Sequence, residues 1–303
     1  MSRRYAISTA AIAIILSTAP AVAAERGIGI YLLGAKTTAA GITPPAGQYL
    51  SNLLYYYAAA DSSHAQAIAD FPSVLWVAPQ DIRGARFGVG LTLVPYWLQI
   101  EAGVPPATDR LFAMGDPLIS ALLGGERGNL HWQFGGLVNV PIGKYEPNRI
   151  ANITFHRWAA DFSYSTTWLD LKTGMEVSGT AGITLNGTNA VTDYHTGNEF
   201  HLEGAIAKHF GEGPYVGAIG YYYNQFTPDT GGGAVRGGFE GRVAALGVAL
   251  GGTFKLGTTP VSASIKYVHE FDARNRLRGG ATFFTVAVPL TEPGNVHAYG
   301  EHR

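Results

Sequence analysis

The stretch GMEVSGTAGITLNG, from Gly174 to Gly187, alternates between two kinds of side chain. Its apolar members stand at odd numbers and its polar members at even ones: Met175, Val177, Ala181, Ile183 and Leu185 against Glu176, Ser178, Thr180 and Thr184. Neighbouring side chains of an extended strand point to opposite faces, so this alternation predicts a β-strand. One face of that strand suits an apolar surrounding and the other suits water.

The same alternation recurs along most of the chain. It is clear in LHWQFGGLVNV (130–140), WAADFSYSTTW (158–168), FHLEGAIAKHF (200–210) and VSASIKYVHEF (261–271). We predict about twelve strands of roughly ten residues, a length that crosses an outer membrane when the strand is tilted. They are expected near residues 48–60, 68–79, 86–100, 116–124, 129–141, 158–170, 174–186, 198–210, 214–226, 238–255, 260–271 and 279–290.

The connections between these strands alternate in length. Short ones include GERG (125–128), LKTG (171–174) and GEG (211–213), and long ones include EAGVPPATDRLFAMG (101–115), IGKYEPNRIANITFHR (142–157) and GTNAVTDYHTG (187–197). Short periplasmic turns and longer extracellular loops are typical of an all-β, up-and-down antiparallel transmembrane barrel of the outer-membrane type. A soluble exported β-sandwich is the alternative fold.

Composition supports a strand-rich exported protein. Only 14% of the 303 residues are charged, 40 are glycine and none is cysteine, so neither a disulfide nor a thiol is available. The formal net charge is -1 and no run of Lys or Arg occurs, which argues against nucleic acid as a partner.

Four regions are predicted. Residues 1–24 have the plan of a secretory signal peptide, with Arg3 and Arg4 before an apolar run and cleavage near Ala23 or Ala24. The adjacent arginines leave the twin-arginine export route open beside the general one. Residues 25–47 form an N-terminal segment, interpreted as an inward, partly helical plug, with a position in the periplasm as the alternative. Residues 48–290 form the barrel, and residues 291–303 form a C-terminal tail.

Polar side chains on the inward faces of the strands are the candidate site residues. A charge at the middle of the lipid-facing surface costs roughly 2 to 4 kcal/mol, so charged residues near mid-strand are assigned to the lumen. The set is Gln133, Asn139, Asp161, Glu176, His201, Glu203, Lys266 and Glu270. These side chains either form a constriction that selects solutes or pair with one another to satisfy buried charge.

No catalytic or metal motif stands out. The nine histidines lack zinc-ligand spacing, and no phosphate-binding loop or nucleophile elbow occurs, so we expect no cofactor, no metal and no enzymatic activity. The enzymatic alternative is a barrel hydrolase that acts on lipids, with Ser163, Ser165 or Ser178 as nucleophile and His201 as base.

Longer motifs resemble a known family. They are PPAGQY (44–49), GKYEPNRIANI (143–153), LDLKTGMEVS (169–178), NAVTDYHTGNEFHLE (189–203), GYYYNQFT (220–227), GGFEGRVAALG (237–247), KYVHEFDARNRLRG (266–279) and FFTVAVPL (283–290). The chain resembles, over about residues 28–290, the outer-membrane transporter family named for the meta-pathway of phenol degradation. The tail TEPGNVHAYGEHR (291–303) departs from the aromatic C-terminal residue with which such barrels often end, so the assembly machinery is expected to read the strand FFTVAVPL.

The resemblance implies passive uptake of small hydrophobic or aromatic compounds across the bacterial outer membrane. Expected partners are outer-membrane lipid, the solutes themselves and the barrel-assembly machinery. A barrel of about twelve strands is narrower than a 16-stranded porin, which suits a selective channel. A structural barrel with a closed lumen is the other alternative to the channel.

Overall fold

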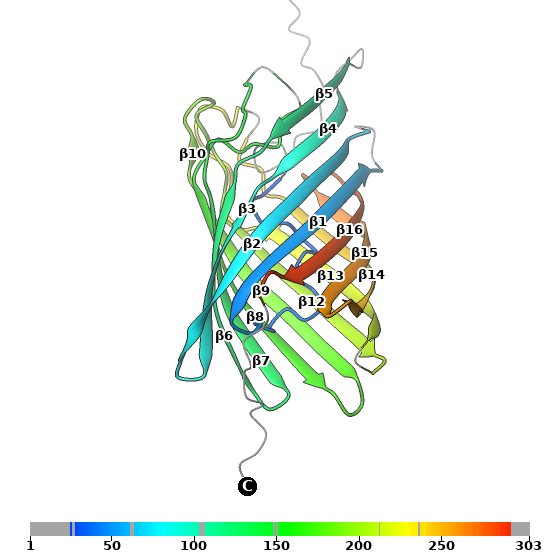
Figure 1. Cartoon of the computed structure of the whole chain (residues 1–303). Helices are drawn as coiled ribbons and strands as arrows, with labels where there is room; N and C mark the ends of the chain where they lie inside the picture. The colour runs from blue at the N-terminus through cyan, green and yellow to red at the C-terminus, as the bar shows by residue number, and fades with distance from the viewer. Residues whose placement is uncertain are drawn as a thin grey trace, which may run out of the picture.

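Twelve antiparallel strands close into a barrel in the computed structural model (Figure 1). The model describes residues 25, 28–60, 64–102, 107–147, 149, 151–211, 213–235 and 237–291. The barrel strands are β1 (Gly47–Ala59), β2 (Gln66–Ile82), β3 (Ala85–Thr92), β6 (Leu118–Arg127), β7 (Leu130–Asn139), β8 (Ala159–Asp170), β9 (Met175–Asn186), β12 (Glu199–His209), β13 (Pro214–Gln225), β14 (Arg242–Leu256), β15 (Thr259–Arg274) and β16 (Gly279–Pro289). The remaining strands are β4 (Pro95–Ala102), β5 (Ala107–Met114), β10 (Thr188–Asn189) and β11 (Tyr194–His195).

Strand β1 closes the barrel. It pairs with β2 on one side and with the last strand, β16, on the other, where Tyr49 stands opposite Pro289. All other wall strands pair with their neighbours in the sequence of the barrel, so no strand edge of the closed wall is left free. The closed ring confirms the predicted barrel and rules out the β-sandwich.

The two rims of the barrel differ in the length of their connections. The short-turn rim carries tight connections such as Arg83–Gly84, where both residues have positive φ (54° and 84°), as a two-residue hairpin of primed type requires. The long-loop rim carries residues 140–158, 187–198 and 226–241. The predicted alternation of short and long connections is confirmed.

One predicted strand and one predicted loop are wrong in detail. The strand expected over 86–100 is interrupted at Leu93 and Val94, although β3 and β4 keep one register along β2. Pro72 of β2 stands at the interruption and lacks the N–H that would bond the Leu93 carbonyl. The loop expected over 101–115 is instead the hairpin β4–β5, which rises at the long-loop rim (Figure 1).

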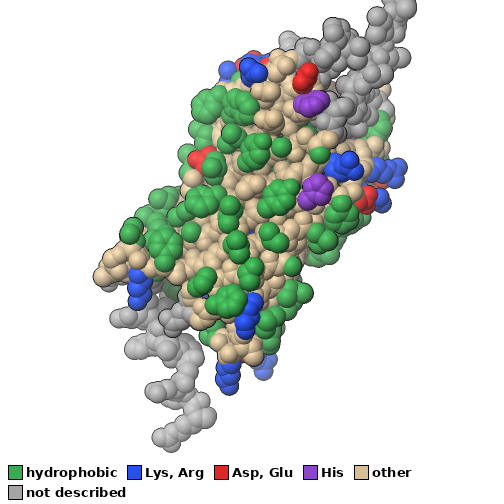
Figure 2. Space-filling view, turned by 90° about the vertical axis from the view of Figure 1, so that its right-hand side faces the viewer, with side chains coloured by type: hydrophobic (Ala, Val, Ile, Leu, Met, Phe, Trp, Pro, Cys, Tyr) green, Lys and Arg blue, Asp and Glu red, His purple; other side chains and the backbone are tan. Residues whose placement is uncertain are grey.

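The faces of the wall strands follow the predicted alternation. In β9, Glu176, Ser178 and Thr180 are buried, whereas Val177 and Ile183 are exposed on the outside. Figure 2 shows hydrophobic side chains spread over the middle of one outer face and charged side chains mostly toward its ends. The outer surface therefore suits the apolar core of a membrane.

Residues 28–46, called here the N-terminal segment, run inside the barrel before β1 begins. Its backbone consists of turns without a helix, so the prediction of a partly helical segment is wrong. Hydrogen bonds from side chains of β8, β9, β12 and β15 replace the bonds that a helix would supply. The predicted signal peptide before Glu25 and the tail after Thr291 lie outside the described residues.

Candidate functional site

Two opposite charges hold one turn of the N-terminal segment. The Glu203 carboxylate on β12 accepts hydrogen bonds from the backbone N–H groups of Gly34 (2.7 Å) and Lys36 (2.9 Å). The Lys266 ammonium on β15 donates to the carbonyl oxygens of Gly34 (2.8 Å) and Ala35 (2.7 Å). Both side chains are at most 5% exposed, so these bonds form away from bulk water. Each charge is satisfied by the backbone of the segment.

Two further predicted residues also bind the N-terminal segment. The Gln133 side chain accepts a hydrogen bond from the Lys36 ammonium at 2.6 Å, and burial lowers the pKa of Lys36 to about 8. The Glu176 carboxylate accepts the Ala39 backbone N–H at 2.7 Å and lies 2.7 Å from Nε2 of His209. The segment is therefore fastened to the wall along its length.

The arrangement around His201 does not support the hydrolase alternative. Its Nε2 lies 2.9 Å from the Asp161 carboxylate, and its ring stacks on Tyr31 with 3.6 Å between centroids. Its Nδ1 has no hydrogen-bond partner among the described residues, so no described serine is in place as its nucleophile. Ser165 instead bonds Thr180.

Asn139 and Glu270 lie nearer the long-loop rim. The Asn139 amide donates to Asp116 (3.0 Å) and to the Arg157 carbonyl (2.9 Å), which fixes the loop after β7. Glu270 of β15 accepts hydrogen bonds from the hydroxyl groups of Tyr57 on β1 and Tyr221 on β13, each one strand beyond the neighbours of β15. All eight predicted lumen residues are buried in the structure.

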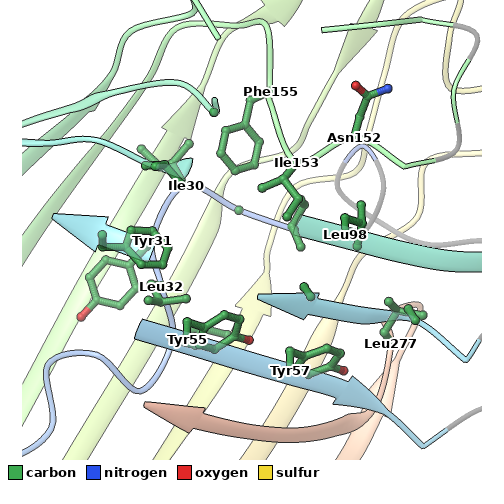
Figure 3. A pocket seen from close by; sticks show the side chains of 18 of the residues that line it. Ile30, Tyr31, Leu32, Tyr55, Tyr57, Leu98, Asn152, Ile153, Phe155 and Leu277 are labelled. Atoms are coloured by element: carbon green, nitrogen blue, oxygen red, sulfur yellow. The ribbon is translucent and has the colours of Figure 1, made fainter. Parts of the chain in front are cut away.

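Above the N-terminal segment lies an apolar cavity of about 180 Å³, called here the upper cavity (Figure 3). Ile30 and Leu32 of the segment line it on one side, and Tyr55 and Tyr57 of β1 line it on another. Side chains from β4 and the loop after β7 complete it, among them Leu98, Ile153 and Phe155. Its lining brings together residues that are far apart in the sequence.

Below the segment lies a second and wider space of about 790 Å³, called here the lower cavity. Thr38 and Tyr215 line it, with 3.2 Å between their hydroxyl oxygens, and Lys172, Lys208 and His209 stand on its wall near the short-turn rim. The N-terminal segment therefore divides the lumen into an apolar compartment and a more polar one with basic side chains on its wall.

Sequence reasoning missed the residues of the upper cavity. Tyr55 and Tyr57 both face the lumen, and Tyr56 between them faces outward, 42% exposed. Three consecutive tyrosines hide the alternation that identifies inward positions elsewhere. Ile153 and Phe155 belong to a loop, for which no periodic pattern exists.

Within the described ranges, no group of three or more His, Asp or Glu side chains is arranged to hold a metal ion. No helix of the described residues is both long and apolar enough to span a membrane.

Comparison with known protein families identifies the family of this chain. Residues 41–286 match the model of a family described as "Putative MetA-pathway of phenol degradation". The chain belongs to this family. Membership confirms the resemblance predicted from the motifs. No curated protein matches the sequence.

Among solved structures, the COG4313 outer membrane channel from Pseudomonas putida F1 is similar in fold. It aligns with a TM-score of 0.70 and 11% identity over 82% of this chain and 98% of that chain. The β domain of the Bordetella autotransporter BrkA aligns with a TM-score of 0.43 and 9% identity over 81% of this chain and 99% of that chain. The likeness to the Pseudomonas channel shows that this phenol-degradation family member has the fold of an outer-membrane channel.

Proposed function

We propose that this protein is a passive outer-membrane channel for small hydrophobic and aromatic compounds. The upper cavity carries the proposal, because it is apolar and lies at the rim with the long loops, which face the exterior in outer-membrane barrels. Its volume of about 180 Å³ suits one aromatic ring, since a dry apolar cavity of roughly 150 Å³ in another protein binds benzene. The protein performs no covalent step and uses no cofactor.

The wall beside the upper cavity is interrupted, which offers a route from the cavity into the membrane. Two neighbouring strand tracks break at one height, at Leu93 and Val94 between β3 and β4 and at Gly115 between β5 and β6, beside Pro72 of the continuous strand β2. Val94 and Gly115 line the cavity. A hydrophobic solute that leaves here avoids the N-terminal segment and the polar lower cavity.

The proposal includes export and assembly. Removal of residues 1–24 on export leaves Glu25 close to the long-loop rim, where its side chain accepts hydrogen bonds from Asn189 and Thr192. The barrel-assembly machinery inserts the closed wall into the outer membrane, and lipid covers the outer face described above.

Solute entry into liposomes that carry the refolded protein tests this function. We expect faster entry of toluene and phenol than into protein-free vesicles, and little entry of a sugar of similar size. Ala67→Phe fills the upper cavity and is expected to abolish the faster entry of toluene and phenol. Val74→Phe, on the outer face of the same strand, is expected to keep it. Equal entry of all solutes indicates a general pore, and no entry indicates a closed barrel. Ester or phospholipid turnover by the same preparation would support the hydrolase.

A further inference from the structure

Three arginines gather on the outside of the barrel at the long-loop rim. Arg242 begins β14, Arg274 ends β15 and Arg278 directly precedes β16, so each stands where one of three neighbouring strands reaches the rim. Figure 2 looks onto this side of the barrel and shows basic side chains grouped with a histidine and an acidic side chain at its edge. These three residues are called here the outer arginine cluster.

The alternation of the strands directs the cluster away from the lumen. Val243 is buried, Ala273 packs against the buried core and Leu277 lines the upper cavity. Successive side chains of a strand point to opposite faces, so the arginine beside each of these residues points outward. Leu246 and Phe271 are exposed on the same outer face, farther from the rim. The cluster therefore borders the apolar surface that suits the membrane core.

The positive charge of the cluster is only partly balanced by the protein. Arg242 and Arg274 stand directly opposite each other in the pairing of β14 with β15, and like charges in that position destabilise a strand pair. Asp272 balances Arg242, with 3.1 Å between its carboxylate and Nη2. In the described part of the chain, exposed Arg274 and Arg278 form no ion pair with any acidic residue, Glu240 of the preceding loop included. Two guanidinium groups are thus open to an anion.

The position of the cluster selects the kind of anion. Long loops face the exterior in outer-membrane barrels, so the cluster lies where the apolar layer of the outer leaflet meets its headgroups. The lipid of that leaflet is lipopolysaccharide, and the lipid A sugars next to its acyl chains carry phosphate groups. A guanidinium group can donate two parallel hydrogen bonds to a phosphate, and each basic residue near an anionic lipid surface contributes about 1 kcal/mol.

We propose that the outer arginine cluster binds a phosphate group on the lipid A sugars of lipopolysaccharide. Arg274 and Arg278 donate hydrogen bonds to the phosphate oxygens, and the acyl chains lie against the exposed apolar side chains of β14 and β15. Arg242 stays paired with Asp272 and adds its charge to the site. The inference goes beyond the passage of solutes and rests on the outer-membrane location within the proposed function.

Two forms of lipid A with the same acyl chains test the inference, one with both phosphate groups and one with both removed. Their binding to the full-length barrel in a non-ionic detergent is measured by native mass spectrometry. We expect the wild type to bind the phosphorylated form about tenfold more tightly, as hydrogen bonds from charged donors require. Arg274→Gln/Arg278→Gln is expected to abolish this preference. Arg274→Lys/Arg278→Lys keeps two cations and is expected to retain part of it.

Arg83→Gln/Arg127→Gln is the matched control, because it removes two exposed arginines from the short-turn rim. It is expected to keep the full preference, and an equal loss in this variant would reduce the effect to net charge and overturn the site. Equal binding of both lipid A forms by the wild type also overturns it. If phosphatidylglycerol or inorganic phosphate binds the wild type as tightly as phosphorylated lipid A, the assignment to lipopolysaccharide is wrong.

Toluene entry into liposomes keeps this inference separate from the proposed function. Arg274→Gln/Arg278→Gln is expected to leave toluene entry unchanged, because the cluster faces away from the upper cavity. Loss of the preference for phosphorylated lipid A with normal toluene entry therefore supports the site. Absence of toluene entry in the wild type would overturn the channel and leave the lipid site to stand on its own binding data.

Discussion

At the scale of single residues, the charged side chains of the lumen serve the chain itself. A buried charge needs partners, because its transfer from water is costly unless hydrogen bonds replace the solvent. Glu203 and Lys266 find them in the N–H and C=O groups of one turn, from Gly34 to Lys36. The two alternatives left open by the sequence, a selective constriction and mutual pairing, both overlook this third possibility.

Glu203→Ala is expected to loosen the N-terminal segment. The change leaves two backbone N–H groups without their acceptor and the nearby Lys266 charge without its opposite charge, a loss of about 2 to 5 kcal/mol. We expect faster leakage of a small sugar through reconstituted barrels and faster protease cleavage within the segment. Glu126→Ala, at a half-exposed glutamate near the end of β6, is the control. Unchanged leakage would show that the other bonds hold the segment without Glu203.

The sequence predicts the face of such residues better than their partners. Alternation along β12 places His201 and Glu203 in the lumen, and the structure buries both. Their partners depend on where an irregular segment lies inside the closed barrel, because Tyr31, which stacks on His201, and Gly34, which bonds Glu203, both belong to that segment. No local pattern encodes that position, because the segment has neither strand nor helix periodicity.

At the scale of elements, the long loop after β7 is fastened to the hairpin β4–β5. Arg149 bonds the Asp109 carboxylate and the Arg110 carbonyl, and the backbone N–H of Ala151 also donates to Asp109. These contacts hold the loop against β5, whose outer edge has no strand partner in the described sheet. Two stretches predicted as long loops thus act together: residues 101–115 contribute β5 to a strand pair, and the loop after β7 covers the edge of that pair.

This contact is expected to depend on pH. The hydrogen bond from Arg149 and that from Ala151 hold the pKa of Asp109 below its ordinary value. The stabilisation is therefore complete above a pH of about 4, the unfolded value, and is lost as the pH falls through the lower folded value. Hydrogen exchange at Ala151, corrected for intrinsic rates, is expected to accelerate only in that acidic range. In the Asp109→Asn variant, hydrogen exchange at Ala151 is expected to be fast at all pH values. If this variant keeps the pH-dependent step, a group other than Asp109 causes it.

Glu25 anchors the upper end of the chain inside the long-loop rim. Its carboxylate accepts hydrogen bonds from Tyr145, Asn189 and Thr192 and lies 4.0 Å from Arg157. Glu25→Ala is expected to weaken this anchor by about 2 kcal/mol, roughly a thirtyfold increase in the released population. Limited proteolysis near residue 25 measures the release. Glu240→Ala, an exposed glutamate of another loop at this rim, is expected to have no effect, and an equal effect would refute a specific anchor.

At the scale of the whole molecule, the N-terminal segment separates the upper cavity from the lower one. The upper compartment is apolar and borders the interrupted wall, whereas the lower one is more polar and wider, with basic side chains on its wall. A straight path for a hydrophobic solute crosses both the buried charges that bind the segment and a polar space. A path through the interrupted wall crosses neither, so the division of the lumen favours lateral passage of apolar solutes.

Locking the lower part of the segment distinguishes the two paths. The chain has no cysteine, so Thr38→Cys and Tyr215→Cys provide the only thiols, at side chains that lie in contact. A short bifunctional thiosulfonate joins them, and a reductant releases them. We expect cross-linking to leave toluene entry within about twofold of the reduced protein, because lateral passage does not move this part of the segment, whereas sugar leakage falls. Each single-cysteine variant, treated with the same reagent, controls for simple modification. If cross-linking stops toluene entry and reduction restores it, the solute passes through the lumen and the segment must move with each passage.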